Sequence, residues 1–189
     1  MDRAWLNDIA KHPRINPTDV LKQFGPLTGG ASPKVQGLHA RALPKRKREI
    51  VEASLFCYGL SCRMERPVWV VDDENADYDF VAVQGINGDN QFSPVQLKEV
   101  VPKYRNKEAS VQSIIDRLAR YPVSAGLTVA IRANQQTMLD LDRITIPPAL
   151  SIAALWIYGA ASQDGSRWVL SGNLIEPEPN LIWTFDYPV

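Results

Sequence analysis

The segment formed by residues 77–101, DYDFVAVQGINGDNQFSPVQLKEVV, constrains the fold of this chain more than any other. An apolar run at residues 80–83 leads into a cluster of glycine, asparagine and aspartate. The chain then returns through residues 95–101, which alternate apolar and polar. Two such runs joined by turn residues predict a β-hairpin. Gln96 and Lys98 are two apart in the returning strand, so they point to the same face.

The hairpin also predicts a chemical site. Asp79 stands directly before the first run, at the same end of the hairpin as Gln96 and Lys98; Asp77 is the alternative carboxylate, with the same strand parity. A carboxylate and an amide oxygen can hold a hard cation such as Mg²⁺. A bound cation lowers the pKa of its water and stabilises charge on a phosphate. A neighbouring lysine can orient that water or neutralise developing charge.

The pattern D-x16-Q-x-K, made by Asp79, Gln96 and Lys98, resembles the PD-(D/E)XK nuclease superfamily, which has the restriction-endonuclease-like fold. Glutamine before x-Lys is similar to the Mrr-like branch, and Tyr78 stands where the family usually has proline. The resemblance covers residues 45–132. It implies an endonuclease-like hydrolase that cleaves nucleic acid, DNA before RNA, with Mg²⁺ or Mn²⁺. In that role Asp79 and Gln96 hold the metal and Lys98 orients the attacking water.

The elements predicted around the hairpin follow the order of the resembled fold. A helix at residues 45–58, ended by Gly59, precedes an apolar strand at 67–71. An amphipathic helix at 110–121 and a strand at 126–132 follow the hairpin. This is the αβββαβ core of an α/β fold with a mixed central sheet flanked by helices, and the order supports the resemblance independently of the motif.

The rest of the chain is predicted to extend this core. Extra C-terminal strands are expected at 139–146, where Asp140 and Asp142 could instead be turn residues, at 151–161, which could be a short buried helix, and at 167–175 and 181–185. Residues 45–189 therefore read as a single nuclease-like α/β domain. Residues 1–44 read as an N-terminal extension, with short helices at 1–10 and 16–24 and a long loop at 25–44.

The resemblance implies one more metal ligand. In the superfamily, a helix before the first strand often supplies a glutamate that completes the site. Glu49 and Glu52 are the candidates, and their separation of three residues places them near one helix face. The distance back from Gly59 slightly favours Glu49.

Two basic segments are candidates for contact with phosphate. Four cations, which are Lys45, Arg46, Lys47 and Arg48, open the predicted helix, where they are unfavourable for the helix dipole. Phosphate contact would explain them, and a solvated basic turn is the alternative. Residues 102–107 form a second basic loop, with Lys103, Arg105 and Lys107 around one tyrosine.

Composition excludes several other functions. The net charge is zero, so there is no overall basic signal for nucleic acid, although residues 1–66 carry 12 basic and 6 acidic side chains. Two isolated histidines support neither a zinc site nor a catalytic triad. Cys57 and Cys62 are expected to be buried free thiols, as in a reducing cytoplasm. The N-terminus has no signal-peptide pattern, and no apolar run is long enough to span a membrane.

Two alternatives to the nuclease stay open. A catalytically inactive protein with the nuclease fold could serve as a binding or structural module in a larger assembly, because glutamine is a weaker cation ligand than a carboxylate. A partner-binding protein could instead be built on an unrelated mixed sheet, in which Asp79 and Lys98 would not converge. Nucleases of the resembled fold often act as dimers, so a homodimer is among the expected assemblies.

Overall fold

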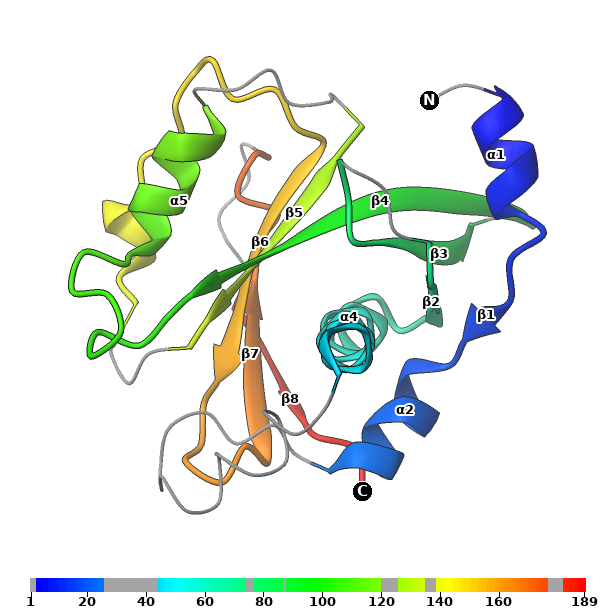
Figure 1. Cartoon of the computed structure of the whole chain (residues 1–189), viewed down its shortest axis with the longest axis horizontal. Coiled ribbons are helices and arrows are strands. Elements are labelled where there is room, and N and C mark those ends of the chain that lie inside the picture. The colour runs from blue at the N-terminus through cyan, green and yellow to red at the C-terminus, as the bar shows by residue number, and fades with distance from the viewer. Residues whose placement is uncertain are drawn as a thin grey trace.

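A computed structural model of the chain describes residues 3–25, 44–73, 77–86, 88–119, 126–134, 139–176 and 182–189. Within these residues an eight-stranded sheet carries helices on both faces (Figure 1). The strands are β1 (Arg14–Ile15), β2 (Val68–Val71), β3 (Phe80–Ile86), β4 (Asp89–Val100), β5 (Thr128–Ala133), β6 (Ala154–Ala160), β7 (Arg167–Ser171) and β8 (Ile182–Asp186). The helices are α1 (Arg3–Ile9), α2 (Pro17–Phe24), α4 (Lys45–Met64) and α5 (Val111–Leu118), with a 3₁₀ turn at Leu141–Arg143.

The strands lie in the sheet in the order in which they occur in the chain. Neighbours from β1 to β4 are antiparallel, β4, β5 and β6 are parallel, and β6 to β8 are antiparallel again. Helix α5 makes the crossover that a parallel β4–β5 pair requires. The predicted mixed α/β sheet flanked by helices is confirmed, and so is the element order α4–β2–β3–β4–α5–β5.

Two hydrophobic cores lie on opposite faces of the sheet. Helix α4 fills the concave side, where it contacts β2 at one end of the sheet and β7 and β8 at the other (Figure 1). Its fully buried Val51, Leu55 and Phe56 pack there. The opposite face is covered by α5 and α1, through Ile115 and Ile9. Helix α5 is amphipathic, as predicted, and Ser110 caps its first turn by accepting the Ser113 N–H.

Helix α4 does not end at Gly59, which corrects the predicted boundary. It continues to Met64 and ends at Glu65, which adopts a left-handed conformation with φ of 51°. Gly59 is needed for packing, because a Cβ there would lie 2.8 Å from the Phe185 ring of β8. Glycine therefore allows the C-terminal strand to approach the helix, and the helix pays only a modest cost in propensity.

Two other predicted boundaries change. The strand predicted at residues 139–146 is a 3₁₀ turn, because the Asp140 side chain accepts the Asp142 N–H and stabilises a local turn, the alternative that the sequence left open. The hairpin turn is tighter than predicted, since Gly85 and Asn90 still pair within the β3–β4 ladder.

The N-terminal segment belongs to the same sheet and core. Strand β1 pairs with β2, and Leu21 of α2 is fully buried. The Tyr187 hydroxyl approaches the carbonyl oxygens of Leu21 and Gly25 at 3.0 Å and 2.6 Å, which ties the C-terminus to α2. Most of the loop predicted at 25–44 lies outside the described residues.

Both cysteines are free, with Cys57 buried and Cys62 half-buried. Burial raises the pKa of the Cys57 thiol above its ordinary value, so this side chain stays a neutral thiol within the α4 core. None of the helices in the described part of the chain has the length and apolarity to cross a membrane.

Candidate functional site

The candidate site lies where β3 begins and β4 continues past it, a place we call the fork. The last ladder pair joins Phe80 to Val95. Beyond it, the Asp79 N–H donates to the Val95 carbonyl at 2.9 Å, and the Asp79 carboxylate accepts the Leu97 N–H at 2.6 Å. The carboxylate thus satisfies a strand donor that has no further β3 residue to pair with.

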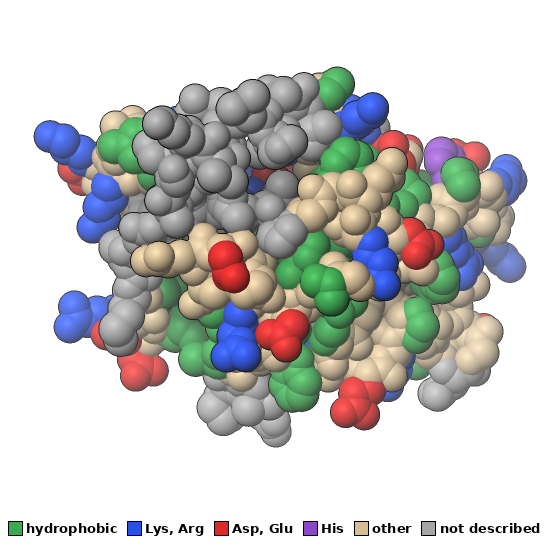
Figure 2. All heavy atoms as spheres, turned by 90° about the horizontal axis from the view of Figure 1, so that it is seen from below, with side chains coloured by type: hydrophobic (Ala, Val, Ile, Leu, Met, Phe, Trp, Pro, Cys, Tyr) green, Lys and Arg blue, Asp and Glu red, His purple; other side chains and the backbone are tan. Residues whose placement is uncertain are grey.

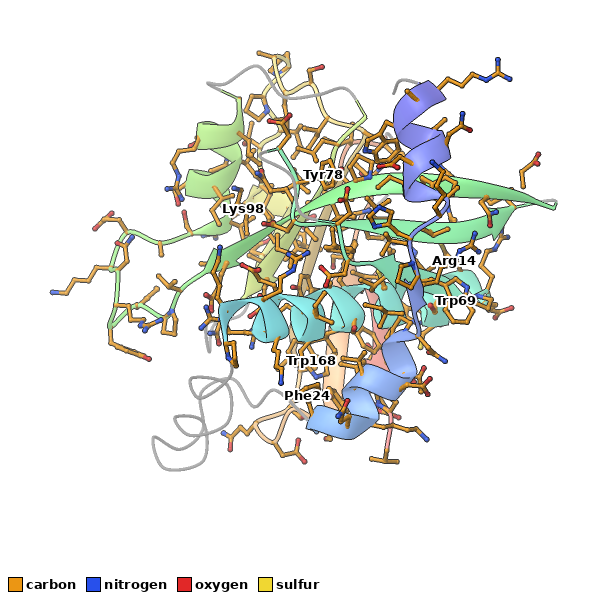
Figure 3. The ribbon with its side chains drawn as sticks, turned by 45° about the vertical axis from the view of Figure 1, so that its right-hand side comes forward. Arg14, Phe24, Trp69, Tyr78, Lys98 and Trp168 are labelled. Atoms are coloured by element: carbon orange, nitrogen blue, oxygen red, sulfur yellow. The ribbon has the colours of Figure 1, made fainter. Side chains whose placement is uncertain are left out.

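The side chains of β4 alternate between the two faces at the fork. Val95 and Leu97 pack in the α4 core, whereas Val100 packs in the α5 core. Gln96 and Lys98 have the parity of Val100, so they lie on the α5 side. Figure 3 shows Tyr78 at the start of β3 and Lys98 on the neighbouring β4.

Lys98 and Asp79 are close enough to interact electrostatically. Lys98 is half-buried, and burial lowers its pKa from the usual value. The Asp79 carboxylate opposes this shift, and the Arg117 guanidinium of α5 adds to it. Gln96 is half-buried on the same face of β4 as Lys98, and these two residues flank Leu97, whose N–H the Asp79 carboxylate accepts. Asp77, the alternative to Asp79, is exposed.

Glu49 is linked to the fork through Arg46, in the first turn of α4. The Arg46 guanidinium donates to the Asp79 carbonyl at 3.2 Å and lies 3.6 Å from the Glu49 carboxylate. It also pairs with Asp72, just after β2. Lys45 approaches Glu49 from the other side, at 3.3 Å. The Arg46 guanidinium therefore links the Glu49 carboxylate to the backbone of Asp79.

Glu52 is not at the fork, although it lies one helical turn from Glu49. Its carboxylate forms an ion pair with Arg132 of β5, at 2.9 Å. Burial raises the pKa of Glu52, and Arg132 opposes that shift while Glu99 adds to it. The Arg132 guanidinium lies 5.8 Å from the Trp168 ring centroid. The candidate metal role of Glu52 finds no support in this geometry, because its partners belong to the contact between α4 and the middle of the sheet.

Sequence reasoning missed Arg132 and its neighbours. In register, Glu99, Arg132 and Tyr158 stand side by side on the parallel strands β4, β5 and β6. One signal could have found them: Arg132 is a lone charge in an apolar strand run, and a buried charge needs a partner. Its partner, Glu52, comes from a helix 80 residues earlier.

The predicted basic residues divide into two groups. Lys45, Lys47 and Arg48 are exposed at the start of α4, whereas Arg46 is half-buried among its acidic partners. The second group is fully exposed on the loop after β4, and it consists of Lys103, Arg105 and Lys107. Figure 2 shows one face of the molecule, seen from below, where the described acidic and basic side chains are interspersed.

An open groove of about 480 Å³ lies between the end of β4, the following loop and α5. Val100 and Ile114 contribute apolar lining. Its charged lining is mostly acidic, with Glu99, Glu108 and Asp116 against Arg117. The groove therefore disfavours a phosphate inside it.

Among the described residues, no group of three or more histidines, cysteines and carboxylates is arranged to hold a metal ion. At the fork, Arg46 lies among the oxygens of Glu49, Asp72 and Asp79. Any cation bound there would rely on few protein ligands. Comparisons with family models, curated proteins and solved structures found no match to this chain.

Proposed function

We propose that this chain is a metal-dependent phosphodiester hydrolase whose active site is the fork. One observation carries the proposal: the Asp79 carboxylate accepts the N–H of Leu97, the residue between Gln96 and Lys98, although 18 residues separate Asp79 from Leu97. The α4–β2–β3–β4–α5–β5 order supports it, because that is the core order of the nuclease superfamily that the motif resembles. The proposed substrate is nucleic acid, DNA before RNA.

The donor set fits a hard cation of the Mg²⁺ or Mn²⁺ type. Proteins commonly hold Mg²⁺ by one or two carboxylates, with water and substrate phosphates as the other ligands. Asp79 and Gln96 would hold the ion, and Glu49, which is linked to the Asp79 backbone through Arg46, would be the further carboxylate that the resemblance implies. When bound, the ion would supply a water of lowered pKa and neutralise charge on the phosphate.

Lys98 would either orient the attacking water or stabilise negative charge on the phosphate. Because burial lowers its pKa, more of its amine is neutral near pH 7 than in an exposed lysine. The neutral Nζ can accept a hydrogen bond from water and orient it for attack. The protonated Nζ can instead stabilise negative charge on the phosphate. Asp79 favours the protonated form, so it tunes the balance between these two roles.

The test is a cleavage assay with Mg²⁺ and with Mn²⁺ on supercoiled plasmid, single-stranded DNA and structured RNA. We expect cleavage by the wild type, and a loss of about 100-fold or more in Lys98→Ala. Lys11→Ala is the matched control, because Lys11 is exposed and its ion pair among the described residues is with Asp8, one turn away. Equal cleavage by Lys98→Ala and wild type would contradict the assignment.

A second candidate is a binding module that keeps the fold without catalysis. It is favoured by the hydrogen bond of Asp79 to Leu97, which gives the carboxylate a structural task, and by the engagement of Glu52 with Arg132. Calorimetric titration with Mn²⁺ separates the two candidates. The hydrolase should show a saturable site that Asp79→Asn abolishes, and the binding module should show none.

A further inference from the structure

The loop at residues 102–108, which we call the basic loop, directly follows β4 and its Lys98. Its own hydrogen bonds define its shape. Arg105 and Asn106 both donate their N–H groups to the Pro102 carbonyl, at 2.9 Å and 3.3 Å, and the Asn106 side chain accepts the Glu108 N–H at 3.0 Å. The loop therefore presents its outward side chains from a defined turn.

Tyr104 is an exposed aromatic side chain of the basic loop. It is 78% exposed, more than any other large hydrophobic residue of the described chain except the C-terminal Val189. Exposed Lys103 and Arg105 flank it, and exposed Lys107 follows. An aromatic ring on which a base can stack, surrounded by cations that contact phosphates, is the arrangement that binds single-stranded nucleic acid without sequence preference.

The groove beside the loop decides where such a strand would run. Carboxylates of Glu99, Glu108 and Asp116 line the groove, so phosphates are repelled from it. The cations Lys103, Arg105 and Lys107 are exposed and do not line this groove. A strand would therefore cross the outer surface of the basic loop, with its phosphates on the cations and one base on the Tyr104 ring.

A duplex cannot use this ring in the same way. Its bases are stacked on each other and paired, so no base face is available without unstacking, which costs a few kilocalories per mole. A strand with unpaired bases offers its faces at no such cost. The exposed ring therefore favours an unpaired strand over a duplex.

We propose that the basic loop binds single-stranded nucleic acid, with Tyr104 as a stacking platform, and delivers an unpaired strand to the fork. The inference rests on the proposed function for the cleavage step, which it deepens by naming the substrate class. The binding step itself needs neither metal nor cleavage.

The test measures fluorescence anisotropy in EDTA with three labelled probes. These are a single strand of about 15 nucleotides without self-complementarity, the duplex of that strand with its complement and an abasic strand with the same number of phosphates. The wild type should bind the single strand most tightly. Tyr104→Ala should weaken that binding about tenfold, and Tyr104→Phe should keep it, since both rings stack. Neither variant should change binding of the duplex or the abasic strand.

Two further variants complete the experiment. Lys107→Ala should weaken binding of all three probes and reduce the single-strand salt slope by about 0.7, because it removes one phosphate contact. Trp183→Ala, at a partly exposed aromatic on β8, should change nothing. Equal affinity of wild type and Tyr104→Ala for the single strand, an equal loss on the abasic strand, or no binding by wild type would each overturn the proposal. Binding as expected without cleavage would overturn the hydrolase alone.

Discussion

The Asp79 carboxylate accepts the backbone N–H of Leu97 at 2.6 Å, so the residue proposed to hold a metal also closes the β3–β4 ladder at the fork. One carboxylate oxygen of Asp79 thus stabilises the sheet at the point where β3 begins. This double role means that substitutions of Asp79 must be chosen to separate stability from chemistry.

Asp79→Asn and Asp79→Ala should differ in stability and agree in activity. The asparagine keeps an oxygen acceptor for the Leu97 N–H, so its free energy of unfolding should change by less than about 1 kcal/mol. The alanine leaves that N–H without its acceptor and should cost about 1–3 kcal/mol. Both should lose Mn²⁺ binding and cleavage. Urea denaturation and calorimetry measure the two effects, and wild-type cleavage by Asp79→Asn would disprove the metal role.

Gln96→Glu should strengthen metal binding. A carboxylate adds a negative charge to a neutral amide ligand, and hard cations prefer it. We expect the Mn²⁺ affinity to rise about tenfold, which corresponds to about 1.4 kcal/mol. Gln91→Glu is the matched control, because it adds the same charge to β4 away from the fork and can still accept the hydrogen bond from Gln84. An equal gain in both variants would point to overall charge rather than to a ligand.

Arg46→Met should also raise the affinity for Mn²⁺. The guanidinium lies among oxygens of Glu49, Asp72 and Asp79, where it repels an incoming cation. Its removal should strengthen binding severalfold, as measured by calorimetry. Arg66→Met, just beyond the other end of α4, is the control. Weaker binding in Arg46→Met would mean that the arginine shapes the site instead of competing for it.

The Glu52–Arg132 pair should be a stability element. Arg132→Met should destabilise the fold by about 3 kcal/mol, because it leaves the largely buried Glu52 carboxylate without its counter-charge. Glu52→Gln should cost less, because the neutral amide keeps an oxygen acceptor for Arg132 and the raised pKa of Glu52 already favours a neutral group there. The double variant should cost clearly less than the sum of the two. Urea denaturation of all four proteins gives the coupling energy. Additive costs would show that the two side chains stabilise the fold independently.

Glu52 should also give stability a measurable pH dependence. The pKa of Glu52 in the folded protein is raised above its ordinary value of 4.5. Between pH 4.5 and the folded-state pKa, the folded state therefore binds more protons than the unfolded state. Stability should therefore fall as the pH rises from about 4.5 through the folded pKa. Comparing the free energy of unfolding across this window in wild type and Glu52→Gln isolates the contribution. The expected result is a shallower fall in the variant, and equal slopes would contradict the raised pKa.

Local pattern was enough to predict the elements that build the fork. Alternation in residues 95–101, the glycine-rich turn and the amphipathic α5 each depend on neighbours within a few residues, and all three are present, although the turn is tighter than predicted. The order of elements was predicted as well, and its helix between β4 and β5 is the crossover that the parallel pairing of these strands requires.

Tertiary structure decided what local pattern could not. Gly59 ends a helix in an isolated sequence, but Phe185 packs against it and α4 continues. Glu49 and Glu52 look equivalent at three residues apart, yet Arg46 links one to the fork and Arg132 pairs with the other. The sequence by itself therefore determined the hairpin and most of the strands and helices around it. Which carboxylate reaches the fork depended on contacts between residues far apart in the chain, because a buried charge is stabilised by whatever partner the fold brings to it.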